Sequence, residues 1–245
     1  MTRGRTIAIA SGKGGVGKTW FAITLAHALT RLGRRVMLFD ADLGLANVDI
    51  QLGLTPRLDL ATVISGKATI AEAMLAYADG GFAIVAGRSG SGLLSALDPD
   101  TLERVLAALQ AEATRYDVVL LDLGAGLERA VRRMSAWADK LLVLATEEPT
   151  SLTDAYAVLK LFAADRPDGT VRIVVNQATT RTAGERTFAT LERACRTFLG
   201  RSPSLAGIVR RDERVRDAIR RQTLLLSRHP NAPAANDVEA IARSL

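Results

Sequence analysis

Short runs of apolar residues recur along the chain, separated by longer segments in which apolar positions come every third or fourth residue. Apolar runs with little alternation are typical of strands that are buried on both faces of a parallel sheet. The longer segments have the spacing of amphipathic helices. Seven runs are predicted as strands: residues 6–10, 35–40, 82–86, 116–122, 140–145, 171–176 and 205–208.

The predicted helices lie between these strands, so that strand and helix alternate along the chain without a linker or a repeat. Gly33 ends the first helix and Asp98-Pro99 begins another. This order predicts an α/β fold, with a doubly wound, mainly parallel sheet and helices on both faces, in a single domain over residues 1–245. Helices are expected from Trp20 onward, over 59–78 with a break at 65–66, over 98–114, from Thr150, over 184–199, in an arginine-rich segment after residue 208, and over 236–245. A flexible glycine-rich loop is expected at 87–92.

Composition narrows the class of protein. The chain has 245 residues, of which 48% are hydrophobic, and this suffices for one large core. It has no apolar run long enough to span a membrane, and its first residues lead into the first strand without a signal peptide. The single cysteine, Cys195, can form neither an internal disulfide nor a metal-binding pair. We therefore expect a cytoplasmic protein.

Positive charge is concentrated in one segment. The formal net charge is +6, and residues 201–228 contain eight arginines against three acids. Such a cluster can contact the phosphates of nucleic acid or of anionic lipid. It can also be a solvated helix face in an arginine-rich protein, and this simpler interpretation is favoured.

The segment Gly-Lys-Gly-Gly-Val-Gly-Lys-Thr follows the first predicted strand and precedes the first predicted helix. In this context the pattern G-x-x-x-x-G-K-T predicts a phosphate-binding loop. Backbone N–H groups would surround a polyphosphate, Lys18 would reach the β- and γ-phosphates, and Thr19 would ligate Mg²⁺. The alternative, a glycine-rich turn without a ligand, is disfavoured. The residues expected to bind the nucleotide are Gly12, Lys13, Gly14, Gly15, Val16, Gly17, Lys18 and Thr19.

Aspartates stand at the ends of two predicted strands, where the ligands of open α/β sheets bind. Asp40 ends the second strand, and Asp42 follows two residues later. An acid beside Mg²⁺ can hold its coordinated waters, and the next one can orient the water that attacks the γ-phosphate. Asp122 closes the clearest buried strand, as the acid of a Walker B element does, and small residues follow it. The alternative for Asp40 and Asp42 is a cap or turn carboxylate. The alternative for Asp122 is a plain acid at the end of a strand, and it is disfavoured.

Two polar residues have less specific surroundings. Asn176 ends the sixth predicted strand, where its amide could pair with the edge of adenine or satisfy a local turn, and both interpretations stay open. Lys13 has no evident task within its own loop, and by itself it would be a solvated charge.

Four stretches, residues 12–19, 40–54, 122–126 and 148–160, resemble the MinD/ParA family of ATPases with a deviant Walker A motif. The resemblance covers nearly the whole chain, and within the family it is greatest to the FlhG branch (FleN, YlxH), which controls flagellar number and placement. It implies slow, partner-stimulated ATP hydrolysis with Mg²⁺ by a homodimer that ATP assembles. It also implies protein partners of the flagellar or polar-positioning type and peripheral contact with the inner membrane or cell pole.

The resemblance also implies roles for single residues. Lys13 would reach the nucleotide of the opposite subunit and act in catalysis with Lys18 and Asp42. Thr19, Asp40 and Asp122 would hold the metal, and Asn176 would lie against adenine.

This sequence departs from the family pattern at two positions, and other functions remain open. Trp20 stands where a small polar residue is usual, and Leu123 replaces a Thr or Ser, which puts γ-phosphate sensing there in question. The chain also lacks the N-terminal extension of FlhG and a clear membrane-targeting helix at its C-terminus. The alternatives are a ParA-type partition ATPase that binds DNA nonspecifically and a MinD-type septum-site ATPase.

Overall fold

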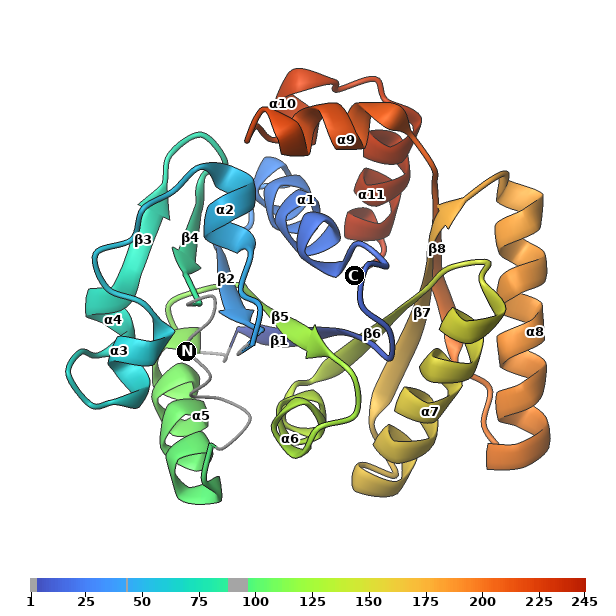
Figure 1. The fold of residues 1–245 in the computed structure, drawn as a ribbon, viewed down its shortest axis with the longest axis horizontal. Helices are drawn as coiled ribbons and strands as arrows, with labels where there is room; N and C mark the ends of the chain where they lie inside the picture. Colours follow the sequence, from blue (N-terminus) through green and yellow to red (C-terminus); the bar gives the residue numbers. More distant parts are fainter. Residues whose placement is uncertain (1–3, 43, 88–96) are drawn as a thin grey trace.

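The computed structural model describes residues 4–42, 44–87 and 97–245. Within them, eight strands form one sheet in the order β3-β4-β2-β5-β1-β6-β7-β8, and all neighbours are parallel except β3 and β4 (Figure 1). The strands are β1 (Arg5–Ser11), β2 (Val36–Ala41), β3 (Met74–Tyr77), β4 (Phe82–Val85), β5 (Val118–Ala125), β6 (Lys140–Ala145), β7 (Thr170–Ala178) and β8 (Ser204–Arg210).

Helices cover both faces of this sheet, as the alternating pattern predicts, and each face has its own hydrophobic core. One layer contains α1 (Lys18–Arg31), α2 (Val48–Leu52), α9 (Glu213–Arg220), α10 (Leu225–Arg228) and α11 (Pro233–Arg243). The other contains α3 (Leu60–Ile64), α4 (Ile70–Ala73), α5 (Pro99–Ala113), α6 (Arg129–Trp137), α7 (Pro149–Asp165) and α8 (Arg181–Leu199). No helix in the described residues is both long and apolar enough to cross a lipid bilayer.

The strand order creates the place for a ligand. The chain leaves β1 through α1 and returns as β2, and β5 later fills the gap between these two strands. The carboxyl ends of β1, β5 and β2 therefore lie next to one another, and Asp40 of β2 is directly opposite Asp122 of β5. The buried central strands explain the seven apolar runs, all of which form strands.

The helix predicted over residues 59–78 is wrong in its last part. Residues 60–64 and 70–73 are short helices, but Met74–Tyr77 is strand β3, antiparallel to β4. The turn at Gly80-Gly81 brings the two strands together, with Gly81 at φ +68° and the rings of Tyr77 and Phe82 5.4 Å apart. Pairing with β4 outweighs the ambiguous helical spacing of this apolar segment.

Three short elements were not predicted: α2, α6 and α10. Two predicted helices begin earlier than expected, α8 at Arg181 and α11 at Pro233. A glycine-rich loop was expected at 87–92, and residues 88–92 of it lie outside the described residues.

Candidate functional site

The glycine loop connects β1 to α1 in a conformation that favours glycine at three positions, Gly12, Gly15 (φ +80°) and Gly17. A Cβ on Gly12 would lie 2.3 Å from the carbonyl oxygen of Asp154, so the loop can pass this backbone only without a side chain. Gly17 has φ +89° and precedes α1 without a side-chain cap. The first N–H groups of this helix are therefore available to an anion.

Two side chains at the end of β7 donate hydrogen bonds to the backbone of the glycine loop. Asn176, which is 2% exposed, donates a hydrogen bond from Nδ2 to the carbonyl of Val16 at 2.7 Å. Gln177, at φ +56°, donates from Nε2 to the carbonyl of Gly15 at 3.3 Å. The side chain of Asn176 thus spans from the sheet to the loop instead of forming a turn of its own, and its contact with adenine stays a prediction.

Two carboxylates meet beneath the loop. Asp40 and Asp122 are both fully buried, and Asp40 accepts hydrogen bonds from the backbone N–H groups of Asp42, Asn47 and Val48. Burial, followed by the charge of Asp122, raises the pKa of Asp40 well above its usual range. Burial also raises the pKa of Asp122 to about 6, although Thr19 and Lys18 nearby offset part of the rise.

Asp42 shapes the segment after β2. Its Oδ1 accepts hydrogen bonds from the N–H groups of Gly44 at 3.3 Å and Leu45 at 3.0 Å. A Cβ on Gly124 would lie 3.3 Å from the same oxygen, so the segment after β2 closely approaches the carboxyl end of β5. Asp42 therefore makes the hydrogen bonds of a turn carboxylate, and its role toward a water molecule remains a prediction.

A cavity of about 530 Å³ opens at this point. The predicted residues among those that line it are Gly14, Gly15, Gly17, Lys18, Thr19 and Asp42, together with Gly124. Gly12, Lys13, Val16, Asp40, Asp122 and Asn176 surround or support the cavity without lining it.

The side chain of Lys13 contacts the start of α7 and does not line the cavity. Its Nζ lies 2.6 Å from Oε2 of Glu148 and 3.0 Å from the hydroxyl of Thr150. The hydrogen bond from Lys13 lowers the pKa of Glu148. In this single chain the lysine is therefore held by its own subunit.

The donor set suits a magnesium ion bound together with a phosphate. In the described part of the chain, no three His, Cys, Asp or Glu side chains are placed to hold a metal by themselves. Neither oxygen of Asp122 completes a hydrogen bond of good geometry with a described residue. Mg²⁺ takes few protein ligands and completes its shell with water and phosphate oxygens, which fits Thr19 and Asp122 here.

Several residues of the site were missed from the sequence. Gln51, Glu128 and Ile219 line the cavity, and Glu148 pairs with Lys13. Glu148 stands in one of the stretches that resemble the MinD/ParA family, which could have marked it. Gln51 likewise stands in such a stretch, residues 40–54, whereas no local pattern identifies Ile219, which comes from α9.

The fold and this site define a class: a nucleotide-binding protein of the P-loop type. The chain belongs to the family described as the CobQ/CobB/MinD/ParA nucleotide binding domain, whose pattern matches residues 7–225.

Individual relatives agree with this assignment. The antiactivator FleN of Pseudomonas aeruginosa is 38% identical over 241 residues, which are 98% of this chain and 86% of FleN. The septum site-determining protein MinD of Bacillus subtilis is 33% identical over 179 residues, 71% of this chain and 65% of that protein. Among solved structures, MinD of Pyrococcus horikoshii, complexed with Mg-ADP, superposes with a TM-score of 0.81 at 22% identity and covers 98% of this chain and 95% of its own. This last similarity concerns the fold.

Proposed function

We propose that residues 1–245 act as one Mg²⁺-dependent ATPase domain that forms a homodimer with ATP and works as a switch in the control of flagellar number or placement. The observation that carries the proposal is the convergence of the glycine loop, Lys18, Thr19 and Asp42 on one cavity, next to the paired, buried Asp40 and Asp122. The FleN relative, which is similar over nearly the whole chain, supports the flagellar role. MinD of Bacillus subtilis is similar over a shorter part.

The position of each side chain at the cavity indicates its role in binding or hydrolysis. Lys18 is 8% exposed and lines the cavity, where its ammonium would neutralise phosphate charge. The Thr19 hydroxyl would ligate Mg²⁺, which supplies further charge neutralisation at the phosphates, and Asp122 and Asp40 would orient the coordinated waters. Asp42 also lines the cavity, where a carboxylate can orient an attacking water.

The surface around the cavity supports dimerisation. Leu45, Ile50 and Leu127 are 69%, 53% and 42% exposed, and each lines the cavity or precedes a residue that does. Exposed apolar residues that gather around one site are typical of a surface that another molecule covers. A second subunit placed there would also bring Lys13 of each chain toward the other.

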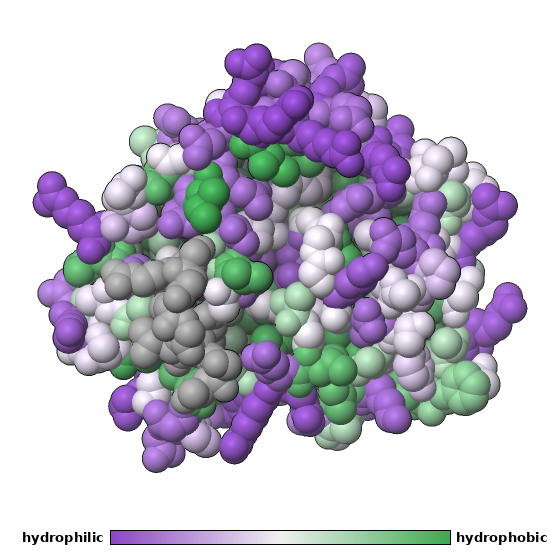
Figure 2. Space-filling model, viewed as in Figure 1, coloured by the Kyte–Doolittle hydropathy of each residue, from purple (hydrophilic) through white to green (hydrophobic). Residues whose placement is uncertain are grey.

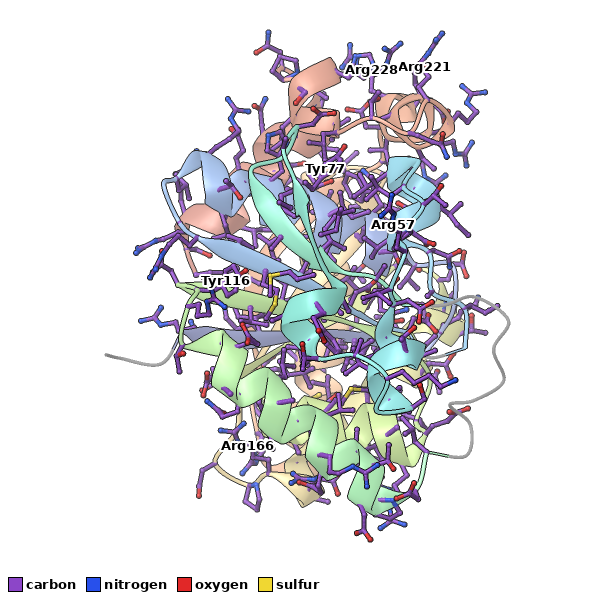
Figure 3. The ribbon with its side chains drawn as sticks, turned by 90° about the vertical axis from the view of Figure 1, so that its left-hand side faces the viewer. Arg57, Tyr77, Tyr116, Arg166, Arg221 and Arg228 are labelled. Atoms are coloured by element: carbon purple, nitrogen blue, oxygen red, sulfur yellow. The ribbon has the colours of Figure 1, made fainter. Side chains whose placement is uncertain are left out.

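The arginine-rich segment gives less support to nonspecific DNA binding. Its part in α9 and α10 lies at the top of the molecule, where the surface is mostly polar (Figure 1 and Figure 2). Arg221 and Arg228 lie together there (Figure 3), and both pair with Asp217. Further pairs join Arg210 to Asp237, Arg214 to Asp212 and Arg216 to Glu213. Because acids compensate most of these arginines, the solvated interpretation is favoured.

The biochemical test compares the unchanged protein with Asp42→Ala. We expect Asp42→Ala to retain ATP-dependent dimers, measured by light scattering, and to lose phosphate release by at least about a hundredfold. Asp100→Ala removes an exposed acid from α5, in the other helical layer, and serves as the matched control. Unchanged phosphate release in Asp42→Ala would refute its role, and a protein that binds no ATP would refute the proposed function.

The biological test follows the tagged protein in the cell and counts flagella after deletion of its gene. A changed number or placement of flagella supports the proposal. Normal flagella with misplaced septa, or with unequal partition of DNA, would assign the chain to one of the alternative roles.

A further inference from the structure

Two polar groups in one part of the cavity form no hydrogen bond with any described residue. They are the indole Nε1 of Trp20 and the side-chain oxygen Oε1 of Gln51. Both residues line the cavity that also contains Lys18 and Thr19, and Trp20 is 6% exposed. Buried polar groups usually have a partner, so an unpaired donor and an unpaired acceptor in one cavity indicate a missing ligand.

Three helices form the walls of this part of the cavity. Trp20 comes from α1, Gln51 from α2 and Ile219 from α9, and α2 contacts both other helices. Hydrogen bonds fix α2 at both ends: Asp40 accepts from the N–H of Val48 at 3.1 Å, and Gln222 donates to the carbonyl of Ile50 at 2.8 Å. Gln51 is therefore carried by a helix with a defined position.

The chemistry of the two groups selects the ligand. An indole N–H can only donate, and an amide oxygen can only accept. A hydroxyl group does both, so it can accept from Trp20 and donate to Gln51 at the same time. Ile219 adds an apolar wall against which the carbon atoms of a sugar can pack.

The position of Trp20 relates this ligand to the phosphates. Trp20 follows Thr19 directly, and it stands three residues after Gly17, so that both lie on the same side at the start of α1. A nucleotide whose phosphates rest on the loop would extend its next group, the ribose, along this side of the helix.

We propose that Trp20 and Gln51 bind the ribose hydroxyls of the nucleotide and so select ribonucleotides. This inference rests on the proposed function, because it takes ATP as the ligand. An ordered water, or an amide of a partner protein, would satisfy the same two groups but would not distinguish ribose from deoxyribose.

Nucleotide affinity tests the proposal without reference to turnover. The chain has two tryptophans, so Trp137→Phe makes Trp20 the single fluorescent reporter, and Trp137 itself packs in the other core at the end of α6. ATP, 2′-deoxyATP and 3′-deoxyATP are titrated in Mg²⁺, by Trp20 fluorescence in Trp137→Phe and by calorimetry in every variant. At least one deoxy analogue should bind about tenfold more weakly than ATP.

Trp20→Phe keeps an aromatic ring and removes only the N–H donor. It should weaken ATP binding and bring the affinities for ATP and its deoxy analogues within about twofold of one another. Gln51→Met, which removes the acceptor from a partly exposed position, should act in the same direction and provides a second measurement if Trp20→Phe folds poorly. The Trp137→Phe control should keep the full preference for ATP.

The outcomes separate the two proposals. Equal binding of ATP and both analogues to the unchanged protein overturns the ribose assignment but leaves the proposed ATPase intact. A preference for ATP that persists in both Trp20→Phe and Gln51→Met also overturns it. Failure of every nucleotide to bind overturns the proposed function itself.

Discussion

At the scale of single residues, the most informative side chains are polar groups that are buried without a partner. His27 on α1 is 7% exposed, and its Nδ1 has no hydrogen-bond partner in the described residues. Burial, together with the nearby charge of Arg31, lowers the pKa of His27 from 6.5 to about 4. The folded protein therefore keeps this imidazole neutral at pH values where the unfolded chain protonates it.

This difference makes stability depend on pH. Between pH 6.5 and 4 the unfolded state binds the additional proton, so the free energy of unfolding falls as the pH falls. From pH 7 to pH 5 the contribution of His27 is a loss of about 2 kcal/mol. Asp40 and Asp122, whose pKa values are raised, titrate in the same range with the opposite sign, so His27 is isolated by a difference. In urea unfolding, lowering the pH from 7 to 5 should cost the unchanged protein about 2 kcal/mol more than it costs His27→Leu. The same dependence on pH in the unchanged protein and in His27→Leu would contradict the assignment.

Lys13 gives a second prediction for a single residue. Because it pairs with Glu148 at the rim and does not line the cavity, Lys13→Ala should leave ATP affinity within about twofold. If the lysine serves the partner subunit, the same variant should remain monomeric with ATP in size-exclusion chromatography with light scattering. Lys160→Ala, an exposed lysine of α7, is the control and should still dimerise. A normal ATP-dependent dimer of Lys13→Ala would remove the intersubunit role.

Residues of the site could be predicted from the sequence where they belong to a continuous motif or end an apolar strand. Gly12 to Thr19 follow one motif, and Asp40 and Asp122 each end an apolar strand, so the sequence locates them. Long-range pairs were not predictable. The bond from Asn176 to Val16 and the pair of Lys13 with Glu148 connect residues 160 and 135 positions apart. Nothing in either local sequence indicates the other partner.

At the scale of elements, long buried strands were easier to predict than short segments that depend on a neighbour. β5 begins with four consecutive apolar residues and needs no partner to be recognised, whereas the four residues of β3 become a strand only by pairing with β4. α6 was missed because three arginines interrupt its apolar positions. It is helical because Val131 and Met134 pack into the core beneath it.

α2 shows how a glycine at a helix end positions the wall of the cavity. Gly53 ends α2 at φ +65°, and a Cβ there would lie 2.9 Å from Oε1 of Gln222, whose amide bonds to Ile50. Gly33 after α1 has φ +80° but open space around it. Gly33→Ala should therefore cost about 1 kcal/mol of backbone strain.

Gly53→Ala carries the same strain and also displaces Gln222. It should cost about 2 kcal/mol in urea unfolding, because a hydrogen bond of about 1 kcal/mol is lost as well. Equal costs for the two alanine variants would show that the bond from Gln222 to Ile50 contributes nothing to the stability of α2. The comparison is well matched, since both glycines follow a helix in the same layer.

At the scale of the whole molecule, the site lies at the carboxyl ends of the central strands β1, β5 and β2. The glycine loop, the two buried aspartates and the cavity lie together at this end of the sheet. Leu45, Ile50 and Leu127 surround the cavity, whereas Phe198, which is 75% exposed, ends α8 away from it. The proposed dimer would cover the first group and leave Phe198 in water.

Charge placed on the covered surface should therefore act differently from charge placed elsewhere. Leu127→Glu should weaken the ATP-dependent dimer at least about tenfold, because burying a leucine contributes about 1.5–3 kcal/mol and a carboxylate there must be desolvated. Phe198→Glu removes a larger exposed hydrophobic residue and should leave the dimer unchanged. Sedimentation at several protein concentrations, with and without ATP, measures both dissociation constants. If Phe198→Glu weakens the dimer and Leu127→Glu does not, the subunits meet through a different face and Lys13 cannot reach the partner's nucleotide.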